Sequence, residues 1–262
     1  MRGVAESILR RYRFVTVLGL TLLAVLAWVW ILSGAGMGMA GQAEFLVFPH
    51  RATGMDMTMP WDTPRFAITL AMWWVMMVAM MLPAAAPLVL LYARAAPAQG
   101  FSSPHIGAFL AGYLTCWLGY STAAVCLQLL LDRTGLLNAM TMSLSSRWLS
   151  GGLLVAAGIY QLTPAKNACL SNCRNPAELL SRHFRPGAFG AFRMGLIHGS
   201  FCVGCCWLLM ALLFVVGIMN LAWVALLTIL VAAEKLLPGG MWLARIGGLL
   251  LLAWGGLILV VG

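Results

Sequence analysis

The chain has 262 residues, of which 62% are hydrophobic and 9% are charged, and its mean hydropathy is +0.94. Soluble domains carry about 25% charged residues, so this composition excludes an ordinary soluble domain and predicts an integral membrane protein. The formal net charge of +9 does not indicate nucleic-acid binding, because the Lys and Arg residues stand between apolar runs.

Seven apolar runs approach the roughly 20 residues that a helix needs to cross a bilayer. They cover residues 14–32, 66–93, 105–131, 147–163, 190–216, 221–237 and 241–261, and the fourth and sixth are short. The first run is not followed by a small-residue cleavage pattern, which favours a retained helix over a signal peptide. The sequence shows no internal repeat or low-complexity linker. It therefore predicts one all-α domain over residues 1–262, a polytopic transmembrane bundle of about seven helices.

The Lys and Arg residues predict the orientation of this bundle. Twelve of the sixteen fall on the side that carries the N-terminus. The other four are Arg51, Arg65, Arg133 and Arg147. Because cytoplasmic loops are enriched in Lys and Arg, we expect the N-terminus inside and, after an odd number of spans, the C-terminus outside.

Sulfur-containing residues divide between the two sides of the predicted membrane. The first outer loop carries Met55, Met57 and Met59, whereas Cys169 and Cys173 lie in the basic inner loop after the fourth run. Thioethers do not form disulfides on the oxidising side, and thioethers and thiolates both suit Cu(I). The alternative is that the methionines are simply filler, which is common in membrane proteins.

The stretch "HGSFCVGCCW", residues 198–207, holds the densest group of candidate metal ligands. At about 100° per residue, His198, Cys202, Cys205 and Cys206 share one helix face about 100° wide. His198 and Cys206 are nevertheless about 12 Å apart along the axis, too far to bind one ion. These residues therefore need partners from other helices or must act as successive stations along a path.

The expected depth of these residues in the membrane favours a functional role for this helix face. If the helix enters the hydrocarbon near Phe192, His198 lies about 9 Å and Cys202 about 15 Å inside it. Buried histidine is costly there unless it is paired or bound. The alternative is helix packing through the neighbouring glycines. Glu234, at a comparable level in the sixth run, could orient His198, or instead pair with Lys235 or Arg245.

Two further groups are weaker candidates for metal ligands. Met76 and Met80 continue a helical stripe with Met72 in the second run, a pattern that core packing also produces. Cys169 and Cys173 are spaced i, i+4 and share a helix face if this segment is helical. Such a pair could pass a soft ion to or from the cytoplasm, although a lone pair is a weak signal.

Four stretches resemble a known family in their order and spacing. These are "MMVAMMLPAAAPLVLLYARA", "YQLTPAKNACLSNCRNP", "GAFRMGLIHGSFCVGCCWLLMALLFVVGIMNLAWVA" and "AEKLLP". They resemble the bacterial family labelled domain of unknown function 2182, described as predicted metal-binding integral membrane proteins, over roughly residues 60–250. The resemblance implies a multi-pass protein of the bacterial inner membrane. The positions that match are Met76, Met77, Met80, Met81, Cys169, Cys173, His198, Cys202, Cys205, Cys206 and Glu234.

The combined pattern predicts a Cu(I) binder or conduit, with zinc as the alternative metal at a Cys/His site. We expect the lipid bilayer as its surroundings, a periplasmic or cytoplasmic metal chaperone or a membrane complex as partner, and no nucleic acid. ATP-driven pumping is not expected, because the sequence lacks a Walker motif and an aspartyl-phosphate motif. A binder is favoured over an enzyme. The alternatives are a membrane metalloenzyme, or a metal-containing subunit or assembly factor of a membrane oxidoreductase complex, and a partner subunit whose cysteines are incidental.

Overall fold

The computed structural model of the chain describes residues 2–34, 61–98, 105–138 and 142–261, and the side chains of 14–34, 61–95, 105–138 and 142–261. Nearly all of this described backbone is helical, and its β-type pairing is confined to one isolated bridge between Leu137 and Leu144. The all-α class predicted from the apolar runs is confirmed.

The helices follow one another along the chain from α1 to α10. They are α1 (Arg2–Leu32), α2 (Thr63–Ala98), α3 (Ile106–Arg133), α4 (Arg147–Leu162), α5 (Pro164–Arg174), α6 (Pro176–His183), α7 (Gly187–Ala211), α8 (Leu213–Val216), α9 (Leu221–Leu236) and α10 (Gly240–Val261).

Each of the seven predicted runs is helical, but the helices differ in length. In the described residues, five segments are long and apolar enough to cross a membrane. They are Phe14–Leu32, Thr63–Ala95, Ile106–Arg133, Gly187–Val216 and Gly240–Val261. The helices α4 and α9 have 16 residues each. At about 1.5 Å per residue, each helix is shorter than the roughly 30 Å thickness of the hydrocarbon core. These two correspond to the runs that were already short in the sequence.

The basic stretch expected as an inner loop after the fourth run contains two helices, α5 and α6. Proline at the first helical position has the φ that a helix needs, and both Pro164 and Pro176 start a helix in this way. The Thr163 hydroxyl accepts a hydrogen bond from the Lys166 backbone N–H and so caps α5. Because α5 packs against α7 and α9, this connection is a packed helical segment, the case in which Cys169 and Cys173 share a helix face.

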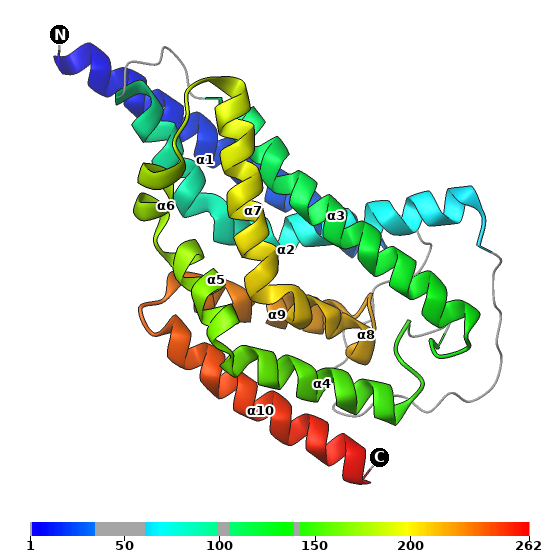
Figure 1. Ribbon diagram of the computed structural model, residues 1–262. Helices are drawn as coiled ribbons and strands as arrows, with labels where there is room; N and C mark the ends of the chain where they lie inside the picture. Colours follow the sequence, from blue (N-terminus) through cyan, green and yellow to red (C-terminus); the bar gives the residue numbers. More distant parts are fainter. Residues whose placement is uncertain (1, 35–60, 99–104, 139–141, 262) are drawn as a thin grey trace.

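The longer helices pack in pairs around a shared core. Figure 1 shows α3 alongside α7 and α4 alongside α10, and α1 lies against α2. The two ends of the chain lie at opposite ends of the molecule. The helix α7 contacts α3, α4, α5 and α9, so its side chains can meet residues from several parts of the sequence.

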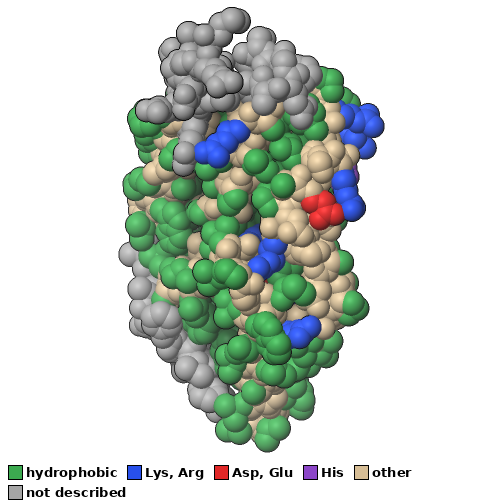
Figure 2. Space-filling view, turned by 90° about the vertical axis from the view of Figure 1, so that its left-hand side faces the viewer, with side chains coloured by type: hydrophobic (Ala, Val, Ile, Leu, Met, Phe, Trp, Pro, Cys, Tyr) green, Lys and Arg blue, Asp and Glu red, His purple; other side chains and the backbone are tan. Residues whose placement is uncertain are grey.

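The outer surface of the helices is largely apolar. Large hydrophobic side chains are exposed along α1, α3, α4, α9 and α10, for example Leu26, Ile229 and Leu250, which are 60%, 66% and 65% exposed. On the face in Figure 2, hydrophobic side chains are spread over the whole length of the molecule, whereas charged side chains are scattered. Water would disfavour such a surface, whereas the acyl chains of a bilayer would solvate it.

Candidate metal site

The helix α7 turns the predicted ligand face inward. His198, Cys202, Cys205 and Cys206 are all buried, with exposed fractions of 1–2%. This burial agrees with the helical spacing, which places all four on one side of α7. Free Cys is common in apolar cores, so burial alone does not make these residues ligands. Side chains from neighbouring helices also contact these residues.

Sulfur from α2 meets the cysteines of α7. The Met81 thioether Sδ lies 3.9 Å from the Cys206 Sγ. Since metal–sulfur bonds measure about 2.3 Å, one ion between these two atoms can bond both. Cys206 and Cys202 are one turn apart and their thiols also interact. A thioether and two thiols from two helices therefore come together.

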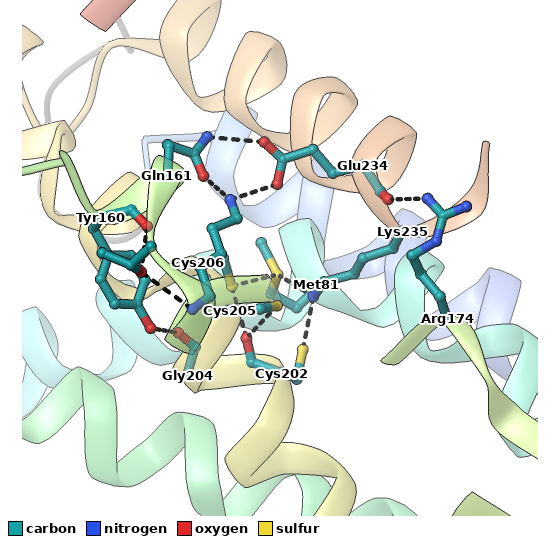
Figure 3. A network of polar contacts seen from close by, with 12 residues as sticks. Met81, Tyr160, Gln161, Arg174, Cys202, Gly204, Cys205, Cys206, Glu234 and Lys235 are labelled. Carbon is teal, nitrogen blue, oxygen red and sulfur yellow. Dashed lines mark hydrogen bonds and ion pairs between the residues drawn. The ribbon is translucent and has the colours of Figure 1, made fainter. Parts of the chain in front are cut away.

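An ammonium group lies in the same cluster of sulfur atoms. Lys235 of α9 is 6% exposed, and its Nζ lies 2.9 Å from the Cys202 Sγ and 3.9 Å from the Met81 Sδ. Figure 3 shows the Lys235 chain reaching from α9 to these sulfurs. The hydroxyl of Tyr113, on α3, lies 3.1 Å from the Cys202 Sγ and also donates to the Met81 carbonyl oxygen. We call Met81, Cys202, Cys205, Cys206 and Lys235 the sulfur cluster.

The two cysteines of α5 extend the sulfur cluster to one side. The Cys173 thiol is hydrogen-bonded to that of Cys205, and the Cys169 Sγ lies against the backbone of Gly204. The hydrogen bond to Cys205, together with burial, raises the pKa of the Cys173 thiol. Burial also raises the pKa of Cys169. The pair therefore lies within the helix packing and not in an open loop.

Glu234 does not reach His198 in this structure. Its carboxylate pairs with Lys166 of α5, with 2.7 Å between Glu234 Oε2 and Lys166 Nζ, and accepts a hydrogen bond of 2.9 Å from the side-chain amide of Gln161. Lys166 also donates to the Gln161 side-chain oxygen. Both predicted roles of Glu234, as the partner of His198 and as the partner of Lys235 or Arg245, are therefore wrong.

His198 occupies an aromatic environment one turn before Cys202. Its ring stacks on Tyr113, with 5.4 Å between ring centroids, and lies 6.4 Å from Phe109. Within the described part of the chain, neither ring nitrogen has a hydrogen-bond partner, although the residue is 2% exposed. A buried polar group without a partner is costly, and an unpaired imidazole nitrogen is free to bind an ion.

The structure describes two of the five predicted methionine ligands, Met76 and Met80. Met76 and Met80 are buried in the common core, and it is the adjacent Met81 that contacts a cysteine. Met55, Met57 and Met59 lie outside the described residues. Lys235, Lys166 and Tyr113 were not proposed as site residues. The adjacent charges of "AEKLLP" at the end of an apolar run were the signal for Lys235.

The described residues contain no group of three His, Cys, Asp or Glu side chains arranged to hold a metal ion. The thiols and the thioether instead form a chain of contacts from Cys173 through Cys205 and Cys206 to Met81 and Cys202. Thiolates and thioethers are the ligands that Cu(I) prefers.

A helical protein with buried thiols and a thioether in contact belongs to the class of candidate soft-metal proteins. Comparison with known families identifies it further. The sequence model of the PpoB2 family, described as copper chaperone, matches residues 70–258, and the chain belongs to this family. The match supports the prediction of copper handling, although it does not carry the name of the domain of unknown function 2182 family that the motifs resemble. No curated protein and no solved structure matches the chain.

Proposed function

We propose that the chain is a membrane-embedded copper chaperone that holds one Cu(I) ion between Met81, Cys202 and Cys206. The observation that carries this proposal is the 3.9 Å contact between the Met81 and Cys206 sulfurs. Zinc binds Cys, His and carboxylate side chains, so a thioether at this position favours Cu(I) over the alternative of zinc. The family description, copper chaperone, supports the same metal.

The apolar surface supports a location within a bilayer. Five segments are long and apolar enough to cross a membrane, and α1, α3 and α10 among them expose large hydrophobic residues along their outer faces. The excess of Lys and Arg on one side favours an N-terminus inside. If the shorter α4 and α9 cross the bacterial inner membrane as well, this orientation would put α5 toward the cytoplasm and residues 55–59 outside. A chaperone of this kind delivers its ion to a protein partner at either face.

Copper content tests the proposal directly. We expect the purified full chain, loaded with Cu(I) under anaerobic conditions in detergent, to retain about one copper per chain. Because loss of an indirect partner of a metal typically weakens binding 10–100-fold, loss of a ligand in Cys202→Ser or Cys206→Ser should weaken Cu(I) binding by at least about 100-fold. Competition with a chromogenic Cu(I) chelator measures this affinity, and elemental analysis measures the copper per chain.

The matched control is Cys126→Ser, because Cys126 is an exposed free thiol on α3. This variant should bind copper like the unmodified chain. Met81→Leu should weaken binding less than the cysteine variants, since a neutral thioether is a weaker ligand than a thiolate. Unchanged affinity in both Cys202→Ser and Cys206→Ser would exclude the site.

We further propose that Cu(I) moves along the sulfur atoms. Met55, Met57 and Met59 would collect the ion, the sulfur cluster would hold it, and Cys173 with Cys169 would exchange it on the opposite side. The contact between Cys173 and Cys205 supports the last step. If this path operates, proteoliposomes containing the chain should take up Cu(I), and Cys173→Ser should slow uptake while the copper bound per chain stays the same. Binding without uptake would indicate a static chaperone.

A further inference from the structure

Lys235 places a positive charge directly against the proposed ligands. Its Nζ donates to the Cys202 sulfur at 2.9 Å and lies 3.9 Å from the Met81 sulfur. The residue is almost fully buried. An ammonium group removed from water is strongly disfavoured unless an opposite charge compensates it.

The neighbouring carboxylate does not provide this compensation. Glu234 precedes Lys235 on α9, but consecutive helical residues point about 100° apart, and Glu234 pairs with Lys166. Among the side chains that the structure describes, no carboxylate lies within 4.0 Å of the Lys235 Nζ. Lys166 and Glu234 neutralise each other, so the buried groups facing Lys235 are the sulfurs.

From this arrangement we infer that Lys235 makes the site selective for monovalent ions by neutralising a Cu(I) complex with two thiolates. This inference rests on the proposed function. One Cu(I) ion bound by the Cys202 and Cys206 thiolates carries a net charge of −1, and the Met81 thioether adds none. With the Lys235 ammonium the whole group is neutral. The two thiol protons are released as the ion binds.

The same sum of charges disfavours a divalent ion. Zn²⁺ with two thiolates is already neutral, so the Lys235 ammonium would leave a buried charge of +1. Lys235 acts through this charge and not as a ligand, because an ammonium group has no lone pair to donate. It therefore gives selectivity where ligand type alone does not, since thiolates bind both Cu(I) and zinc.

Competition between ions in Lys235 variants tests this inference. The purified full chain in detergent is titrated anaerobically with Cu(I) and Ag(I) as monovalent probes and with Zn²⁺ and Cd²⁺ as divalent probes. In Lys235→Leu we expect the affinity for Cu(I) and Ag(I) to fall about 10–100-fold, the range typical for a residue that supports a metal ligand. The affinity for Zn²⁺ and Cd²⁺ should stay the same or rise. Lys235→Arg keeps the charge and should keep the original preference.

The ratio of monovalent to divalent affinity separates charge from structural damage. A merely structural role for Lys235 would weaken binding of all four ions in parallel, and that result would overturn the inference. An unchanged ratio in Lys235→Leu would overturn it as well, while the proposed copper site would stand if the unmodified chain still bound Cu(I). Failure of the unmodified chain to bind Cu(I) would instead reject the proposed function itself.

Discussion

Replacing Lys166 by leucine is expected to lower the free energy of unfolding by about 3–5 kcal/mol, the usual cost of breaking a buried ion pair. The side chains of Lys166 and Glu234 are 0% and 2% exposed. Without Lys166, the Glu234 carboxylate would remain buried, and among the described side chains the Gln161 amide would be its remaining partner. The midpoint of thermal unfolding in detergent micelles, followed by circular dichroism, measures the loss.

An exposed ion pair in the same molecule provides the matched control. On α6, the Arg182 Nη2 lies 2.6 Å from the Glu178 Oε1, and the two side chains are 69% and 52% exposed. Such surface pairs contribute about 0–1 kcal/mol to stability. Glu178→Gln should therefore leave the midpoint nearly unchanged. The double variant Lys166→Leu/Glu234→Gln removes both buried charges and should recover most of the loss. A double variant as unstable as the sum of its single variants would contradict this explanation.

The Lys166–Glu234 pair also supports the site, because it joins α5 to α9. On α5, Lys166, Cys169 and Cys173 follow one another at intervals of three and four residues and thus share a face. On α9, Lys235 follows Glu234 directly. The guanidinium of Arg174 adds a hydrogen bond of 2.8 Å to the Glu234 carbonyl oxygen. These contacts fix the α5 cysteines relative to the Lys235 ammonium.

The inward face of α7 could be predicted because helical spacing is a local property. Three cysteines and a histidine at intervals of three and four residues share one side of any helix, and an apolar sequence of this length forms a helix in a bilayer. The same arithmetic predicted that α7 alone could not surround one ion. The structure supplies the missing neighbours from α2, α3, α5 and α9.

The identity of those neighbours could not be predicted, since it depends on helix packing. Met80 and Met81 differ by about 100° on α2, and only the packing of α2 decides which sulfur faces Cys206. Lys166 and Glu234 are 68 residues apart in sequence, so no local pattern relates them. The sequence alone left a helix at α5 open because the polar composition of this segment resembles a loop, although Thr163 and Pro164 are typical of a helix start.

Enlarging Gly112 is the second change expected to have a large effect, because α3 and α7 touch through their backbones there. A Cβ added at Gly112 would lie 2.1 Å from the Phe192 carbonyl oxygen, and one added at Gly195 would lie 2.0 Å from the Phe109 carbonyl oxygen. Close approach at small residues is a common way for membrane helices to pack. Since backbone atoms cannot rotate away, Gly112→Leu must push the two helices apart.

We expect Gly112→Leu to destabilise the protein by at least about 3 kcal/mol, the upper part of the range for overpacking, and to weaken Cu(I) binding as well. Tyr113 follows Gly112 on α3 and contacts Cys202, so separation of the helices removes this contact. The control is Gly119→Leu on the same helix, where an added Cβ meets no atom within 4 Å. Both variants gain the same helix propensity of leucine over glycine, about 1 kcal/mol, which cancels in the comparison. Equal unfolding midpoints and equal copper affinity in the two variants would show that the approach of α3 to α7 does not hold the site together.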